Sequence, residues 1–267
     1  MTKLTATRLA GSPQAAEVLI VGPSLGTSAE ALWSRCAARL PFEVVGWDLP
    51  GHGRSEPAAE AFSVTDLAEA VRDVAQAVAG GRAAWYAGVS LGGAVGLELG
   101  MYPGPFGAVA VLASAPKIGD VAAWHERADL VRRAGTSVML SGSAERWFAP
   151  GFTDREPAVA DALLTSLSET DPESYALACE ALASFDVRDR AGDTRVPLLV
   201  AAGQYDRVVP PEQARSAVPD VFAVIPGCAH LPPAEDPATV ADLLTSFFRS
   251  AKGGGDLEGA DVIPLPY

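Results

Sequence analysis

Short apolar runs that end in turn residues alternate along this chain with longer amphipathic stretches, and this alternation limits its fold more than any other feature. The apolar runs have the length of buried strands, and the stretches between them have helical spacing. Strands and helices in this order are typical of an α/β protein, with a mostly parallel sheet and helices on both faces. The predicted strands are residues 18–21, 43–47, 83–87, 108–112, 198–202 and 222–225.

The stretch that follows residue 62 shows how the helices are recognised. Val64, Leu67 and Val71 are spaced so that they fall on one face of a helix. Either Ser63 or Thr65 can cap its N-terminus, since a hydroxyl accepts from the first free backbone amides. We therefore predict a helix that begins beside these two residues.

The alternation stops between residues 118 and 186, where amphipathic stretches follow one another without a strand between them. This segment is predicted to be an all-helical cap inserted over one end of the sheet. Residues 1–117 and 187–250 are predicted to form the α/β core. Residues 251–267 contain a glycine run and prolines, and they are predicted to form a flexible C-terminal tail.

Charge excludes two classes of partner. The 267 residues include 20 Lys and Arg against 33 Asp and Glu, and the net charge of −13 repels phosphate backbones and anionic lipid surfaces. No apolar run reaches the roughly 20 residues that a membrane span needs, and the first residues show no secretion signal. We expect a cytoplasmic protein without a nucleic-acid or membrane partner.

Cysteine spacing and the absence of known binding motifs argue against a disulfide framework, a metal site and a cofactor. Cys36, Cys179 and Cys228 are odd in number and far apart, which fits neither a disulfide framework nor a metal site. The sequence has no P-loop lysine, no dinucleotide fingerprint and no cluster of His and Cys ligands. We therefore expect no metal and no cofactor.

The sequence Gly-Val-Ser-Leu-Gly-Gly at residues 88–93 directly follows a predicted strand and precedes a helical stretch. A serine at such a turn adopts a strained backbone and exposes its hydroxyl at the start of the helix. Ser90 is therefore the predicted nucleophile, and the amide of Leu91 is a predicted oxyanion donor. The alternative interpretation is an ordinary glycine-rich turn.

A serine hydroxyl needs a general base, and the chain contains three histidines, His52, His125 and His230. Catalytic groups of an open α/β sheet lie after the carboxyl ends of strands, and hydrolases with a serine at this kind of strand-to-helix turn have the order serine, acid, histidine. His230 alone follows a predicted strand and comes after the serine. His230 is therefore the predicted base, although a lone loop histidine is often only solvated.

The acid that orients the base should follow a strand between Ser90 and His230. Asp206 comes after the apolar run at residues 198–202, so it is the predicted acid. Its alternative role is that of a turn residue that caps the next helix. Asp186 and Asp193 are weaker candidates, because neither follows a strand.

The loop after the first predicted strand, residues 22–27 (Gly-Pro-Ser-Leu-Gly-Thr), should supply the second oxyanion donor. Pro23 has no amide hydrogen to give. The predicted donor is therefore the amide of Leu25.

With Ser90, Asp206 and His230 in this order around a helical insertion, the chain resembles the α/β-hydrolase superfamily and, within it, the 3-oxoadipate enol-lactonases of aromatic degradation. The serine turn is common to the superfamily, whereas the loop after the first strand and the cap segments are more specific. The resemblance spans residues 15–250 and is carried by residues 22–27, 32–33, 47–55, 86–93, 117–124 and 146–148.

The resemblance implies an α/β-hydrolase fold and the opening of a small anionic enol-lactone to 3-oxoadipate through an acyl-enzyme. An anionic substrate requires local cations, and arginine binds carboxylates through two parallel hydrogen bonds. Arg127 and Arg146 are the predicted substrate ligands, although each cap arginine can instead form surface ion pairs. The arginines of the cap are Arg127, Arg132, Arg133, Arg146 and Arg155.

Three aromatic residues of the cap, Trp124, Trp147 and Phe148, are predicted to line the pocket, with packing of cap on core as the alternative. The chain has Pro23 where many relatives have Asn, and Gly46 where many have Arg, so we expect altered loop shape and charge near the pocket.

Other functions also fit the pattern: hydrolysis of another ester or lactone, cofactor-free perhydrolysis, a non-hydrolytic biosynthetic reaction, or a ligand receptor on the same fold.

Overall fold

The computed structural model describes residues 2–253. In this part of the chain seven strands form one sheet in the order β1-β3-β2-β4-β5-β6-β7. The strands are β1 (Thr5–Ala10), β2 (Glu17–Gly22), β3 (Glu43–Asp48), β4 (Ala83–Val89), β5 (Phe106–Leu112), β6 (Leu198–Gly203) and β7 (Val221–Ile225).

All neighbouring strands from β3 to β7 are parallel, so the prediction of a mostly parallel α/β sheet is confirmed. The exception is β1, which pairs antiparallel with β3 at the edge of the sheet and was not predicted. Its sequence, Thr-Ala-Thr-Arg-Leu-Ala, has few large apolar residues, and its side chains are only partly buried. An edge strand of this kind lacks the continuous apolar run that marks a central strand.

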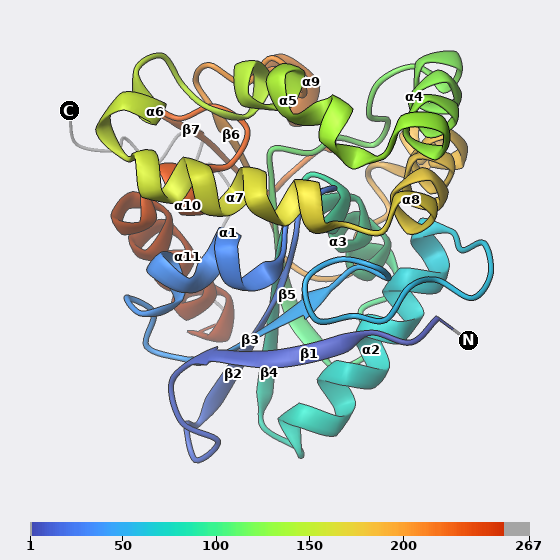
Figure 1. The fold of residues 1–267 in the computed structure, drawn as a ribbon. Coiled ribbons are helices and arrows are strands. Elements are labelled where there is room, and N and C mark those ends of the chain that lie inside the picture. The colour runs from blue at the N-terminus through green and yellow to red at the C-terminus, as the bar shows by residue number, and fades with distance from the viewer. Residues whose placement is uncertain (1, 254–267) are drawn as a thin grey trace.

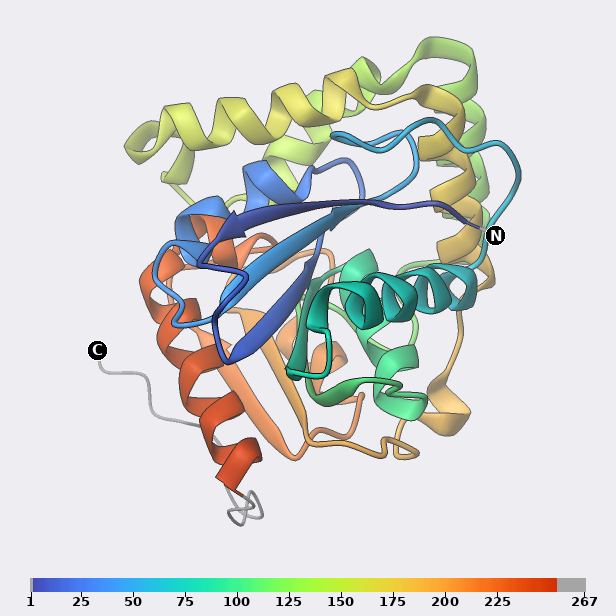
Figure 2. The same cartoon turned by 90° about the horizontal axis from the view of Figure 1, so that it is seen from below.

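Helices cover both faces of the sheet (Figures 1 and 2). One face carries α1 and α11, which contact each other, and the other carries α2 and α3, which also contact each other. The helices of the core are α1 (Ala29–Ala37), α2 (Val64–Ala79), α3 (Leu91–Met101), the 3₁₀ turn η2 (Arg188–Arg190), α9 (Pro211–Arg215), α10 (Pro232–Glu235) and α11 (Pro237–Gly253).

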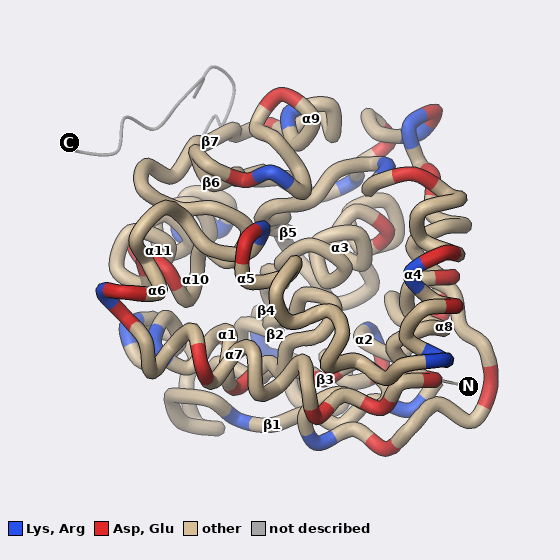
Figure 3. The backbone as a smooth tube through the Cα atoms, turned by 45° about the horizontal axis from the view of Figure 1, so that its top comes forward, with Lys and Arg blue, Asp and Glu red and all other residues tan. Residues whose placement is uncertain are grey.

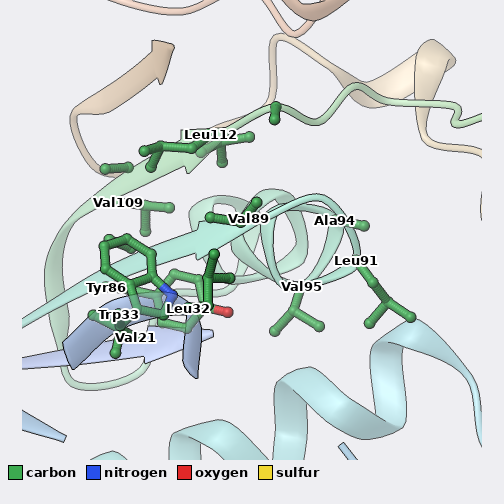
Figure 4. Packing of buried hydrophobic residues seen from close by; sticks show 14 of the residues in the cluster. Val21, Leu32, Trp33, Tyr86, Val89, Leu91, Ala94, Val95, Val109 and Leu112 are labelled. Atoms are coloured by element: carbon green, nitrogen blue, oxygen red, sulfur yellow. The ribbon is translucent and has the colours of Figure 1, made fainter. Parts of the chain in front are cut away.

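The central strands are almost entirely apolar, and the side chains between them and the helices are fully buried. Figure 4 shows Tyr86 of β4 and Trp33 of α1 in this core, close to Val21 of β2. Charged positions are absent from β4 and β5 and lie mainly on the outer helices and loops (Figure 3). Burial of this apolar surface is the main force that holds the sheet and its two helical layers together.

The segment predicted to form the cap contains helices and no strand within the described residues. In Figure 1 these helices gather at the top, where α4 packs against α8. They are α4 (Val121–Ala134), the 3₁₀ turn η1 (Thr136–Met139), α5 (Leu140–Trp147), α6 (Phe152–Arg155), α7 (Pro157–Glu169) and α8 (Pro172–Ser184).

The start of the predicted tail was placed too early. Helix α11 continues to Gly253, so residues 251–253 are helical and belong to the core. The apolar stripe of α11 includes Phe247 and Phe248, both buried, which anchor the helix on the sheet. The rest of the predicted tail, residues 254–267, lies outside the described residues.

The N-terminal capping residues of helix α2 give a direct test of the local structure. Ser63 accepts from the Asp66 amide at 3.1 Å, and the Asp66 carboxylate accepts from the Ser63 amide at 2.7 Å, which is a reciprocal capping box. Ser63→Ala should therefore lower the free energy of unfolding in urea by about 1 kcal/mol. Thr65 lies two residues after Ser63 and is exposed, so Thr65→Ala should change the free energy of unfolding by less than about 0.5 kcal/mol. Equal losses in the two variants would contradict this assignment.

Candidate active site

Ser90 occupies the turn where β4 ends and α3 begins, as the sequence predicted. Its backbone has φ 55° and ψ −112°, a conformation that costs a non-glycine residue about 1–3 kcal/mol. The turn is tight enough that a Cβ on Gly88 would overlap the Gly92 carbonyl. The Ser90 amide donates to the Leu112 carbonyl on β5 at 2.9 Å, which fixes the strained residue to the neighbouring strand.

Two backbone amides beside this turn are free to bind an anion. The Gly92 amide donates to the Pro23 carbonyl at 2.9 Å, and this bond holds the loop after β2 against the start of α3. Within residues 2–253, neither the Leu25 amide nor the Leu91 amide donates to a protein acceptor. Both predicted oxyanion donors are therefore available, one from each side of this junction.

His230 and Asp206 form a buried pair after β7 and β6. Nδ1–H of His230 donates to Oδ2 of Asp206 at 2.9 Å, and each residue is less than 5% exposed. The second oxygen of Asp206 accepts from the amides of Val208 and Val209 at 2.8 and 3.0 Å. Because the carboxylate is fixed on both oxygens, it fixes the ring and leaves Nε2 of His230 for other chemistry.

The remaining histidines and aspartates of the sequence analysis lie away from this pair. His125 is exposed on α4, and Asp193 is exposed in a loop. Asp186 is exposed and pairs with Arg188 at 2.6 Å. His52 is fully buried, and its Nδ1–H donates to the Pro50 carbonyl at 2.9 Å.

A cavity of about 200 Å³ lies between the cap and the core and is bordered by both Ser90 and His230. The core contributes residues from the loops that follow β2, β4, β6 and β7. The cap contributes side chains from α4, α5 and α8. The residues that line it are Ser24, Leu25, Ser90, Ile118, Gly119, Asp120, Ala123, Trp124, Arg127, Ser143, Arg146, Trp147, Tyr175, Val208 and His230.

Two cap arginines, Arg127 and Arg146, face this cavity, as predicted from the expected substrate charge. Neither has an ion pair with a carboxylate in the described part of the chain. Burial and the nearby charge of Arg127 lower the pKa of Arg146. The cavity also contains Asp120, but its carboxylate caps α4 through the amides of Ala122 and Ala123. The cap therefore leaves two cationic side chains ready for an anion.

The other three cap arginines do not reach the cavity. Arg132 binds Glu173 at 2.8 Å and Glu180 at 2.5 Å on the outside of α4 and α8. Arg155 is exposed and donates to the Pro150 carbonyl, and Arg133 is exposed as well. The surface role that the sequence left open therefore applies to these three.

Of the three aromatic residues of the cap, two line the cavity and one does not. Trp124 lines the cavity, its indole N–H donates to the Ile118 carbonyl at 2.7 Å, and Arg127 lies over its ring at 4.7 Å. Trp147 also lines the cavity. For Phe148 the packing alternative applies, because its ring stacks on Phe152 with 5.3 Å between centroids and does not border the cavity.

Sequence reasoning missed two polar residues of the cavity, Tyr175 and Ser143. Tyr175 is buried on α8, and burial raises the pKa of its phenol to about 12, so the hydroxyl is a neutral donor at ordinary pH. Its ring stacks on His52 at 6.3 Å, and its hydroxyl interacts with Arg127. A tyrosine or serine on an amphipathic cap helix carries no motif, so only the folded cap identifies these two.

Pro23 and Gly46, the two positions that depart from the family pattern, lie in different parts of the structure. Gly46 lies within β3, where a Cβ would come within 2.6 Å of Ala29 and 2.9 Å of Leu9. Gly46 itself does not border the cavity, and the expectation of altered charge near the pocket stays a prediction. Pro23 is buried directly before Ser24 and Leu25, and its carbonyl holds the start of α3. We therefore expect Pro23 to affect the shape of the loop that carries Leu25.

Several classes of site are absent from residues 2–253. No group of three or more His, Cys, Asp or Glu side chains is arranged to hold a metal ion. Cys36, Cys179 and Cys228 are all buried, and no disulfide joins them. Among the described helices, none combines the length and apolar character needed to cross a membrane.

Comparisons with known proteins agree with this geometry. Residues 18–243 match the model of the alpha/beta hydrolase family. The chain is 35% identical over 193 residues to 3-oxoadipate enol-lactonase 2 of Acinetobacter baylyi, covering 71% of this chain and 72% of that protein. It is 31% identical over 245 residues to 3-oxoadipate enol-lactonase 1 of the same organism, covering 89% and 91%. The crystal structure of the enol-lactonase from Burkholderia xenovorans LB400 superposes with a TM-score of 0.85 at 26% identity, covering 93% of this chain and 97% of that one.

Burial of His52 should make the stability of the protein depend on pH. Burial lowers the pKa of His52 from 6.5 to about 4. The unfolded chain therefore binds more protons between these two values, and the free energy of unfolding falls as the pH is lowered from 6.5 to 4. The loss attributable to this residue is about 3 kcal/mol. Urea unfolding of His52→Gln should show a shallower pH dependence over this range than the unmodified protein, and parallel curves would exclude His52 as the cause.

Proposed function

We propose that this chain, which belongs to the alpha/beta hydrolase family, is a serine hydrolase that opens a small anionic enol-lactone through an acyl-enzyme. The observation that carries the proposal is the buried His230–Asp206 pair, because His230 borders the same cavity as the strained Ser90. The enol-lactonase likeness at 31–35% identity supports this substrate class over other esters. The specific lactone proposed is 3-oxoadipate enol-lactone.

In the first half of the reaction, Nε2 of His230 takes the proton of the Ser90 hydroxyl as Oγ attacks the lactone carbonyl. The negative charge that forms on the carbonyl oxygen is stabilised by the amides of Leu25 and Leu91, each worth about 3 kcal/mol in the barrier. When the tetrahedral species collapses, the ring C–O bond breaks. The proton on His230 passes to the departing enolate, which becomes the ketone, and the acyl group stays on Ser90.

In the second half, His230 takes a proton from water, and the hydroxide attacks the acyl carbon. The Ser90 oxygen leaves and recovers its proton from His230. The product carries a new carboxylate in place of the lactone. Asp206 remains ionised throughout and keeps the ring of His230 in the orientation that both proton transfers need.

Arg127 and Arg146 are proposed to bind the carboxylate arm of the substrate. The protein has a net charge of −13, so an anionic substrate is repelled unless the site reverses the local sign. Two arginines without carboxylate partners in the described residues meet this requirement. The phenol of Tyr175, which interacts with Arg127, is placed to donate a further hydrogen bond.

Loss of the proposed nucleophile or base should abolish turnover. Ser90→Ala and His230→Ala should each lower kcat for the enol-lactone by on the order of 10⁴-fold or more, because the remaining groups cannot replace the missing proton transfer. Ultraviolet absorbance of the enol-lactone measures this rate, and urea unfolding checks that both variants fold. A residual rate near that of the unmodified protein would remove the substituted residue from the site.

The same assay separates the competing functions. A protein that is inert towards the enol-lactone but labelled at Ser90 by a fluorophosphonate is a serine hydrolase of another ester, a perhydrolase or a non-hydrolytic enzyme. A protein that no fluorophosphonate labels is better described as a ligand receptor on this fold.

Charge recognition is tested by removing the arginines one at a time. Arg146→Ala and Arg127→Ala should each raise KM for the anionic lactone about tenfold, equivalent to a lost charged hydrogen bond of about 1.4 kcal/mol. KM for a neutral ester such as p-nitrophenyl acetate should change by less than about twofold, because no charge contact is lost. Arg132→Ala is the matched control, since Arg132 binds Glu173 and Glu180 away from the cavity. Equal effects on both substrates would argue against a carboxylate clamp.

A further inference from the structure

Glu235 is a half-buried carboxylate that the reaction described above does not use. It ends the short helix α10, five positions after His230. One of its oxygens accepts from the Ala149 amide at 2.7 Å, and the other accepts from the Ala229 amide at 2.8 Å and the Leu231 amide at 3.3 Å. Glu235 has no ion pair with a cationic side chain within the described chain. Within the described residues, both oxygens of Glu235 therefore accept hydrogen bonds only from backbone amides.

These amides belong to two separate parts of the molecule. Ala229 and Leu231 are the two neighbours of His230 in sequence. One oxygen of Glu235 therefore holds the loop around His230, here called the catalytic loop, from both sides. Ala149 belongs to the cap and lies two residues after Trp147, which lines the cavity. Glu235 therefore joins the catalytic loop to the cap.

A second hydrogen bond runs between the same two segments. The amide of His230 donates directly to the Trp147 carbonyl at 3.1 Å. Together with the Glu235 carboxylate, this bond fixes the backbone of the proposed base to the segment of the cap that forms one wall of the cavity. A shift of this cap segment then also shifts the imidazole.

We propose that Glu235 is a positioning residue that couples the seating of the cap to the placement of His230. This inference rests on the proposed function of His230 as the base. The cap supplies the side chains that contact the substrate, so the link ties substrate contact to the geometry of proton transfer. Displacement of a reacting group by about 1 Å costs on the order of 10²-fold in rate, which makes such a link consequential.

The chemistry of the link requires a carboxylate. A carboxylate presents acceptors on both oxygens, whereas a glutamine of the same shape presents one acceptor and one NH₂ group. Glu235→Gln must therefore turn its NH₂ group towards either the Ala149 amide or the pair beside His230. In both cases donors face each other, and one arm of the link is broken while the volume of the side chain is unchanged.

The experiment compares E235Q with D48N in the full-length protein. Asp48 is a buried carboxylate of the same kind, because its two oxygens accept separately from the amides of Ala29 at 2.7 Å and Arg54 at 3.0 Å, but it touches neither the cap nor the catalytic loop. Three quantities are measured in folded protein: the rate at which a fluorophosphonate labels Ser90, kcat and KM for p-nitrophenyl acetate, and the low-field ¹H NMR signal of the proton between His230 and Asp206.

For E235Q we expect labelling and kcat to fall about tenfold or more, with KM within about twofold, because the base is displaced while the neutral ester still binds. The low-field signal should shift or broaden. D48N should leave all three readouts unchanged at a temperature where it is folded. If E235Q does not fold, Glu235→Asp, which keeps the charge but is one methylene shorter, takes its place with the same expected direction.

The inference is overturned if the variant of Glu235 labels and turns over like the unmodified protein, or if D48N loses as much as E235Q. Failure of the proposed function looks different. In that case the unmodified protein itself is not labelled at Ser90 and hydrolyses neither the ester nor the lactone, whatever residue stands at position 235.

Discussion

The close approach of the end of β4 to the start of α3 is the constraint on which the rest of the site depends. A Cβ at residue 88 would overlap the carbonyl of Gly92, so the strand can turn into the helix only because a glycine stands there. The same turn holds Ser90 at a positive φ and brings the Gly92 amide to the loop after β2. One tight junction thus presents the Ser90 hydroxyl to the cavity, frees the amide of Leu91 and positions that of Leu25. The strain is sustained by the mostly apolar sheet and helix packed around it.

The core of the fold and the chain order of the site could be predicted because they depend on local patterns. Continuous apolar runs mark the central strands, and in a parallel sheet the residues that follow those strands meet at one edge. Ser90, Asp206 and His230 were selected on that rule, and the hydrogen bond between the last two is the geometry it anticipates. The edge strand β1 escaped detection because half of its surface faces away from the core, so it carries no apolar run.

The cap was less predictable because its helices meet the core only through tertiary packing. Nothing local distinguishes Phe148, which stacks on Phe152, from Trp147 beside it, which lines the cavity. The same is true of Tyr175 and of Glu235, whose partners are distant in sequence and are mostly backbone groups. The argument from charge predicted residues of the cap more successfully than the argument from local pattern. The expectation that an anion must meet cations in an acidic protein selected Arg127 and Arg146, and both border the cavity.

The two arginines have a further consequence that concerns the end of the catalytic cycle. The two guanidinium groups repel each other, and burial together with the charge of Arg127 lowers the pKa of Arg146. The opening of a lactone converts a monoanion into a dianion, so the proposed product would neutralise this pair more completely than the substrate does. On the proposed function we therefore expect the dicarboxylate product to bind more tightly than the substrate, and we expect its departure to limit the rate of the cycle.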